Sequence, residues 1–334
     1  MSYKNTDYLF ASAYIKSKEK YLLTKERIEK MLGSKTADDA LRILYEMGYG
    51  SDSENISAAD YETLLFRELD KAYHTIISLT PEQKYFTVFL YQNDYHNVKT
   101  LLKAECLGVA ADELLINANT IPLDQLTDMV RNRNYFNMRE AMSQGIREVI
   151  ADYGTSHDPQ VIDVLLDKAC YMDINTAVSK LKNDFIQGYF ILKVDSINLK
   201  SFVRAKEMNK PRDFFPKIYI DGGSVPEKVF ISGYDETLEQ FADRLVIYGL
   251  QTLLLESIDI TNVVSKFTSL EKLCDNLLID YVRGAKYISF GVQPLICYLI
   301  AKENELKTVR IIMTSKLAGI SSELIRERMS NTYV

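Results

Sequence analysis

Tryptophan is absent from this 334-residue sequence, and histidine and cysteine are scarce, at three and four residues. A helical metal site usually pairs two histidines one turn apart, and His74, His96 and His157 all lack a second ligand at that spacing. The cysteines lie far apart in apolar or helical surroundings, so they predict neither a disulfide framework nor a metal site. We expect them to be small core residues of a protein in a reducing compartment: Cys106, Cys170, Cys274 and Cys297.

Long apolar runs are missing as well. Even GVQPLICYLIAKE, residues 291–303, ends in charged residues, whereas a membrane-spanning helix needs about 20 apolar residues. The N-terminal MSYKNTDYLF has no basic segment followed by an apolar one, as a secretory signal would have. We therefore expect a cytoplasmic protein that contacts a membrane only through a partner.

The motifs of common enzymes are also missing. No G-x-x-x-x-G-K-[ST] loop is present to hold a nucleotide. DGGS at residues 221–224 lacks the third glycine and the following helix of a dinucleotide-binding turn, so we interpret it as an ordinary turn. No serine or cysteine lies in a nucleophile motif. The sequence predicts no catalytic, cofactor-binding or metal-binding residue.

The composition is that of a soluble globular protein, with 47% hydrophobic and 26% charged residues. The length exceeds the roughly 250–300 residues of a single core, so two or three subdomains are expected. The net charge of −6 disfavours nucleic acid as a partner. Residues 193–217, however, include seven basic and only three acidic residues, and this local charge of +4 favours an acidic partner. The basic residues are Lys193, Lys200, Arg204, Lys206, Lys210, Arg212 and Lys217.

Apolar residues recur with helical spacing along almost the whole chain. From Tyr61 an apolar residue returns every three or four positions as far as Leu79, which predicts a helix of about five turns. Thr80 before Pro81, Asp158 before Pro159, and the boxes at Thr36 and Ser57 predict helix starts. Pro and Gly residues predict breaks at 209–228 and, less sharply, at 108–124. The fold class indicated is all-α.

One phrase occurs three times. DYHNVKTLLKA (94–104) is followed about a hundred residues later by DSINLKSFVRA (195–205), and ELKTVRIIMTS (305–315) comes a similar distance further on. Each copy has an acid, a polar residue three positions on, and then an aliphatic and a cation, followed by an apolar pair. Such a period is typical of a repeated structural unit. We divide the chain into three helical repeat domains: 1–110, 111–215 and 216–334.

Stretches in three parts of the chain suggest a family. GVQPLICYLIAKENELKTVRIIMTSKLAGISSELIRERM (291–329) resembles the C-terminal signature of the C subunit of V-type and archaeal-type ATPases, a relative of the d subunit of eukaryotic V-ATPases. The N-terminal AYIKSKEKYLL, followed by TADDALRILYEMGYG, is also similar to that family, as is DSINLKSFVRAK in the middle. Two residues depart from the pattern: Gln293 stands where the family often has Glu, and Thr308 where it often has Asn.

The resemblance implies a fold, a function and partners. The fold would be three similar helical domains arranged as a pseudo-threefold funnel. The protein would be a non-catalytic part of the central stalk of a rotary ATPase. It would couple the shaft made of the D and F subunits to the membrane proteolipid ring, for ATP-linked transport of protons or sodium. Its place would be cytoplasmic and peripheral to the membrane. The alternative is a helical-repeat scaffold of another cytosolic assembly.

Basic residues of the second and third copies then become candidates for contact with the shaft. The hypothesis comes from the contrast between the local positive charge and the acidic chain as a whole. The predicted interface residues are Lys200, Arg204, Lys206, Arg310 and Lys316.

Overall fold

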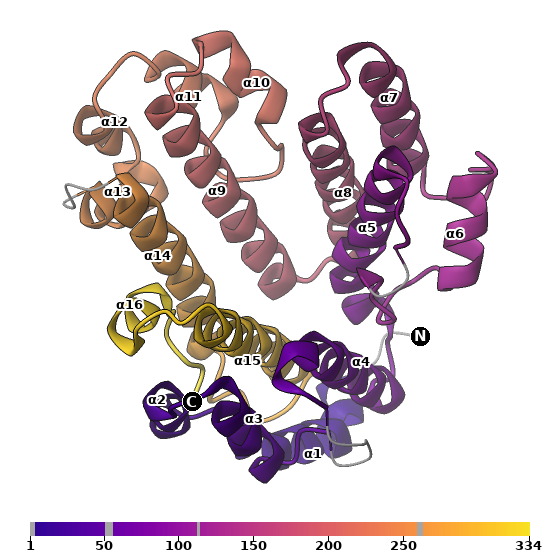
Figure 1. Ribbon diagram of the computed structural model, residues 1–334, viewed down its shortest axis with the longest axis vertical. Helices are drawn as coiled ribbons and strands as arrows, with labels where there is room; N and C mark the ends of the chain where they lie inside the picture. The colour runs from indigo at the N-terminus through magenta and orange to yellow at the C-terminus, as the bar shows by residue number, and fades with distance from the viewer. Residues whose placement is uncertain (1–3, 51–55, 112–113, 259–262) are drawn as a thin grey trace. The chain divides into compact units, whose positions relative to one another are not determined.

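The computed structural model describes residues 4–50, 56–111, 114–258 and 263–334. Every regular element among these residues is a helix (Figure 1), which confirms the all-α class. Within the same residues, no helix combines the length and the apolar character needed to cross a membrane.

The chain divides into two compact units, Met1–Phe86 with Val264–Val334, and Thr87–Val263. The division into three domains at residues 110 and 215 stays a prediction. The first unit contains η1 (Asn5–Tyr8), α1 (Leu9–Glu19), α2 (Lys25–Gly33), α3 (Ala37–Glu46), η2 (Ala58–Asp60), α4 (Tyr61–Leu79), nearly all of α14 (Val263–Gly284), α15 (Val292–Leu317) and α16 (Ser322–Arg328). The second contains most of α5 (Lys84–Leu107), then α6 (Leu123–Arg131), α7 (Glu140–Ser156), α8 (Gln160–Leu181), α9 (Asp184–Glu207), η4 (Arg212–Phe214), α10 (Phe215–Ile218), α11 (Glu227–Ser232), α12 (Leu238–Arg244), η5 (Val246–Tyr248) and α13 (Gln251–Ile258).

Most of the predicted helix starts are confirmed. Helix α4 has the predicted bounds, and Thr36 forms a capping box with Asp39 at the start of α3. The carboxylate of Asp158 accepts a hydrogen bond from the N–H of Gln160, the first residue of α8. The prediction at Thr80 was wrong, because this residue ends α4 by donating its N–H to the Ile76 carbonyl. Helix α5 therefore begins only at residue 84.

The predicted breaks also lie between helices. Helix α5 ends at residue 107 and α6 begins at 123, while α9 ends at 207 and α11 begins at 227. The second break contains two short elements that the sequence did not predict, η4 and α10. Pro216 lies in the first turn of α10, where the missing N–H costs nothing. Of the cysteines, Cys106 is exposed and the prediction of a core position was wrong, because it lies in the last turn of α5 beyond the buried part of that helix.

Each unit has its own core. In the first unit, α15 contacts α1, α3 and α4 (Figure 1), and its Val309, Ile312 and Met313 are fully buried with residues of α2 and α3. In the second unit, the ring of Phe202 on α9 packs against four other aromatic rings, with its centroid 4.2 Å from that of Phe241. The apolar positions predicted for the three copies are thus core positions.

The three long helices that carry the repeated phrase also end alike. Immediately beyond each helical end, the residue at the same position of each copy has a positive φ: Gly108 (67°), Asn209 (52°) and Gly319 (68°). The N–H that follows then reaches back to a carbonyl five residues earlier, at 2.9–3.0 Å. This is the Schellman ending, and its presence at the same position in all three copies supports the repeat.

Candidate functional site

In the first two copies, the acid of the repeated phrase is buried and holds the segment that precedes the next helix. Asp94 accepts a hydrogen bond from the N–H of Ile121 at 3.4 Å, two residues before α6 begins. Asp195 accepts one from the N–H of Val225 at 3.1 Å, two residues before α11, and another from the hydroxyl of Ser224 at 2.7 Å. The repeated acid therefore fastens a backbone segment to its helix.

The asparagine of the phrase, one turn further on, also hydrogen-bonds a backbone segment outside its helix. The amide of Asn97 accepts from the N–H of Ile116 at 2.8 Å and donates to its carbonyl at 2.9 Å. Asn198 forms the same pair with Ile220, at 2.9 and 2.7 Å. Both amides are fully buried, so each pair satisfies two backbone groups that water does not reach.

The glycine pair of DGGS lies in the segment that Asp195 holds. A Cβ on Gly223 would lie 2.3 Å from a carboxylate oxygen of Asp195, and Gly222 has a φ of 104°. The segment needs glycine because its backbone approaches α9 closely and turns through a left-handed conformation. This supports the interpretation of DGGS as a turn.

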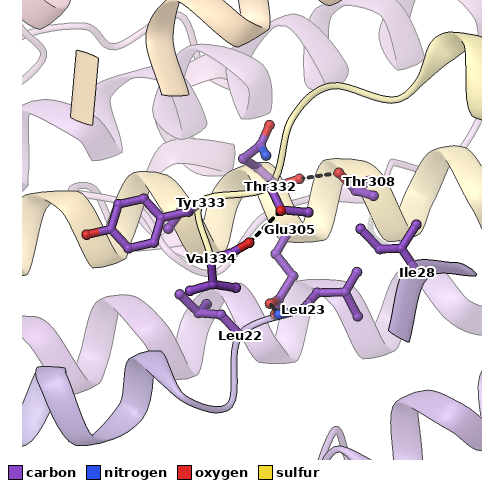
Figure 2. Close-up of a pocket in the computed structure, with 10 residues that line it drawn as sticks. Leu22, Leu23, Ile28, Glu305, Thr308, Thr332, Tyr333 and Val334 are labelled. Carbon is purple, nitrogen blue, oxygen red and sulfur yellow. Dashed lines mark hydrogen bonds between the residues drawn. The ribbon is translucent and has the colours of Figure 1, made fainter. Parts of the chain in front are cut away.

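In the third copy, the long helix α15 holds a segment from the other end of the chain. Glu305 accepts a hydrogen bond from the N–H of Leu23, two residues before α2 begins (Figure 2). Leu23 therefore corresponds to Ile121 and Val225 of the first two copies. The third repeat uses the N-terminal part of the chain for a role that the following part serves in the first two.

Thr308 stands at the asparagine position of this copy and has a different role. Its hydroxyl donates to the carbonyl of Asn304 in the same helix at 2.9 Å. Beside it, Thr332–Val334 of the C-terminal tail and Leu22 line a small cavity of about 10 Å³ (Figure 2). The tail is fastened by its own contacts, including the bond from the N–H of Asn331 to the Asn276 side chain at 2.6 Å.

Two of the predicted interface lysines bind backbone carbonyls of their own unit. The ammonium of Lys206 donates to the carbonyl of Glu236 at 2.6 Å, in the segment between α11 and α12. That of Lys316 donates to the carbonyls of Leu32 and Ser34, at 3.0 and 2.7 Å, at the end of α2. A cation in the position of Lys316 stabilises the last carbonyls of the helix. Burial lowers the pKa of both lysines.

The cation in the middle of the phrase is paired in two copies. Lys99 lies 2.8 Å from Asp167 of α8, and Arg310 makes a bidentate pair with Glu62 of α4, its closest contact being 2.8 Å. Lys200 occupies the same position in the second copy, and its ammonium forms no ion pair or hydrogen bond with any residue that the structure describes. Its charge is therefore not neutralised in the way the other two are.

The predicted interface residues Lys206, Arg310 and Lys316 thus bind groups of their own unit, and Arg204 also has an interaction within the structure. Lys200 is partly exposed on α9, and Arg204 is exposed one turn further along the same helix. The interface itself stays a prediction, and the structure directs attention to these two residues.

Sequence reasoning missed a buried charge cluster in the first unit. The ammonium of Lys302 lies 2.6 Å from a carboxylate oxygen of Glu305, 3.1 Å from the hydroxyl of Tyr49 and 3.5 Å from Glu68. All four residues are less than a tenth exposed. Burial, reinforced by the nearby Glu305 carboxylate, raises the pKa of Tyr49 well above its usual value. The stretch AKENE, where Lys302 and Glu305 are three residues apart, was the available signal.

A second cluster that the sequence did not reveal surrounds Arg139 in the other unit. Its guanidinium lies 2.8 Å from Asp94 and 3.1 Å from Asp173, over the ring of Tyr91 at 4.0 Å. The neighbouring carboxylates raise the pKa of Arg139 against the effect of burial. This ties the start of α7 to α5 and α8, which only the folded chain brings together.

The buried polar groups of the repeated helices thus hold neighbouring segments in place. Residues 11–328 match the model of the ATP synthase (C/AC39) subunit, and the chain belongs to this family.

Named relatives share the whole length of the chain. It is 25% identical to the C subunit of the V-type sodium ATPase of Enterococcus hirae over 319 residues, covering 96% of this chain and 97% of that protein. It is 26% identical to the C subunit of the A-type ATP synthase of Methanosarcina mazei, covering 97% and 93%, and 23% identical to that of Methanocaldococcus jannaschii, covering 96% and 85%. In these ATPases the C subunit is a non-catalytic part of the complex.

Proposed function

We propose that this protein is the central-stalk component of a rotary V/A-type ATPase that couples the shaft of the D and F subunits to the membrane proteolipid ring. The observation that carries the proposal is the family match from residue 11 to 328. In this role the protein works at the cytoplasmic side of the membrane and serves ATP-linked transport of protons or sodium.

The packing of the chain suits such a role. A part that passes torque must resist deformation, and closely packed helices do so because protein interiors have crystal-like density. The buried acid of the repeated phrase hydrogen-bonds each of α5, α9 and α15 to a neighbouring segment, and the asparagine adds a second such contact in the first two copies. The proposed arrangement of the repeats is the pseudo-threefold funnel of the family.

Co-purification tests the proposal directly. The tagged chain, expressed with the other subunits of its ATPase, should bring down both the D–F pair and the proteolipid ring. Removing the chain should leave ATP hydrolysis by the soluble head intact while abolishing ion transport by the membranes. A chain that purifies with neither partner would instead support the scaffold alternative.

Within this proposal, Lys200 and Arg204 on α9 contact an acidic surface of the shaft. The support is the unneutralised charge of Lys200 and the exposure of Arg204. Reversing both charges (Lys200→Glu, Arg204→Glu) should weaken D–F binding roughly tenfold or more at low salt and less at high salt, because salt screens such contacts.

The control for this double variant is Lys35→Glu, which reverses an exposed lysine between α2 and α3 that forms no ion pair or hydrogen bond with any described residue. It should leave D–F binding unchanged. Lys206→Glu and Lys316→Glu are unsuitable tests, since both would remove a cation that is bound to backbone carbonyls of its own unit and destabilise the fold. Equal binding by the α9 variant and the wild type at low and moderate salt would remove this surface from the proposal.

A further inference from the structure

A cavity of about 280 Å³ lies in the first unit, beside the Lys302 cluster. Its lining includes Lys302, Tyr49 and Tyr298, together with Lys18 and Tyr21 of the N-terminal segment. A water molecule occupies about 30 Å³ in the liquid, and drug-sized ligands need roughly 300 Å³ or more. The cavity therefore has room for a ligand smaller than a drug molecule.

The carboxylates in and against the wall of this cavity already have cations beside them. The carboxylate of Glu305 accepts from Lys302 and from the Tyr49 hydroxyl, both in the lining, and from the N–H of Leu23. The carboxylate of Glu68, in the wall, lies 3.5 Å from the ammonium of Lys302, and its other oxygen is 3.6 Å from that of Lys71. The negative charges of the wall are therefore balanced by lysines of the same wall.

Donors, in contrast, remain available. The ammonium of Lys18 forms no ion pair or hydrogen bond with the described part of the chain, and it lies over the rings of Tyr14 and Tyr21 at 5.3 and 6.0 Å. The hydroxyl of Tyr298 likewise forms no hydrogen bond with a described residue. A tyrosine hydroxyl keeps its proton at neutral pH, and burial, together with the nearby carboxylates, raises the pKa of Tyr298 further.

The charge balance points the same way. Three lysines (Lys18, Lys71 and Lys302) and two glutamates (Glu68 and Glu305) lie in or against the lining, which leaves a net charge of +1. A negatively charged ligand with acceptor oxygens would accept hydrogen bonds from Lys18 and Tyr298 and would balance the positive charge of the lining.

We propose that this cavity binds a small oxyanion, a compound that carries a carboxylate or phosphate group, through the Lys18 ammonium and the Tyr298 hydroxyl. The site is separate from the α9 surface and does not depend on the proposed coupling role. An anion bound here would bring additional contacts to α1, α4 and α15, the helices whose side chains line the cavity.

Calorimetric titration of the purified full chain tests the site, with inorganic phosphate and citrate as separate probes for the two kinds of oxyanion. Sodium chloride at matched ionic strength is the reference for non-specific screening. We expect saturable binding of at least one probe. Tyr298→Phe removes only the hydroxyl and Lys18→Met only the charge, and each should weaken that binding roughly tenfold, the worth of one charge-assisted hydrogen bond.

The matched control is Lys20→Met, since Lys20 is exposed on the same segment but does not line the cavity. It should bind the probe as the wild type does, and circular dichroism should show equal helix content in all variants. The proposal is overturned if neither probe binds saturably below about 10 mM, near the weak end of specific affinities. It is also overturned if the Tyr298→Phe and Lys18→Met variants bind as tightly as Lys20→Met.

Discussion

The repeated asparagine should stabilise the chain in two copies, whereas its counterpart in the third should not. We compare Asn97→Leu and Asn198→Leu with Thr308→Val, three changes that remove a polar group and roughly keep the shape of the side chain. Asn198→Leu leaves the N–H and the carbonyl of Ile220 without their partner, in a place that is fully buried. Each orphaned group costs about 1–3 kcal/mol.

The expected loss for either asparagine is therefore about 2–5 kcal/mol of unfolding free energy. A change of 1 kcal/mol moves the melting temperature of a domain this size by roughly 2–4 °C, so the transition of the second unit should fall by roughly 5–15 °C. Thr308→Val removes only a bond from a hydroxyl to a carbonyl of its own helix, and should cost less than about 1 kcal/mol.

Differential scanning calorimetry and urea unfolding measure these changes. The reasoning would be refuted if Thr308→Val destabilised the protein as much as Asn198→Leu. It would fail equally if Asn97→Leu and Asn198→Leu differed greatly from one another, because the two amides make the same pair of bonds with Ile116 and Ile220.

Three further predictions concern the buried charges and the close backbone approach. Lys302→Met should destabilise the first unit by about 3–5 kcal/mol in urea unfolding, since it leaves the buried Glu305 carboxylate without its cation and Glu68 with Lys71 alone; a loss below about 1 kcal/mol would mean that the carboxylates do not depend on this lysine. Gly223→Ala should lower the melting temperature, because its Cβ would meet the Asp195 carboxylate at 2.3 Å, whereas Gly154→Ala on α7, with open space around it, should be neutral or stabilising by up to about 1 kcal/mol; equal effects would contradict this. Tyr49 has a pKa raised above the ordinary value of 10.0, so the stability it confers is complete below that pH and is lost as the pH rises beyond it. Alkaline unfolding, followed by tyrosine absorbance, should accordingly be less steep with pH in Tyr49→Phe than in the wild type, and identical slopes would exclude this residue as a source.

Part of the fold could be predicted from local patterns. The stripe from Tyr61 predicted α4, and the Thr36 box predicted the start of α3, because both depend on residues within a few turns. Thr80 was predicted to begin the second helix but in fact ends α4, because a threonine is compatible both with the residue that follows one helix and with the residue that precedes the next. Cys106 was placed in the core because its neighbours are apolar, although the helix ends there in solvent.

The candidate site was less accessible to sequence reasoning. All five predicted interface residues were chosen for their charge, and charge alone does not distinguish Lys200 from Arg310, whose partner Glu62 lies almost 250 residues away in the sequence. The cavity beside Lys302 is similar, since its walls come from α1, α4 and α15. Residues so distant meet only when the chain folds.

The sequence by itself determined the helices, the threefold phrase and its family resemblance, because helical periodicity is visible in residues a few positions apart and repetition appears when segments of the sequence are compared. Tertiary structure alone decided what the phrase does. It made the acid and the asparagine into locks on a neighbouring segment, and it gave the third acid the N-terminal Leu23 as its partner. The reason is that a hydrogen bond to a buried carboxylate depends on which backbone N–H the fold brings within about 3 Å, and sequence separation places no limit on that choice.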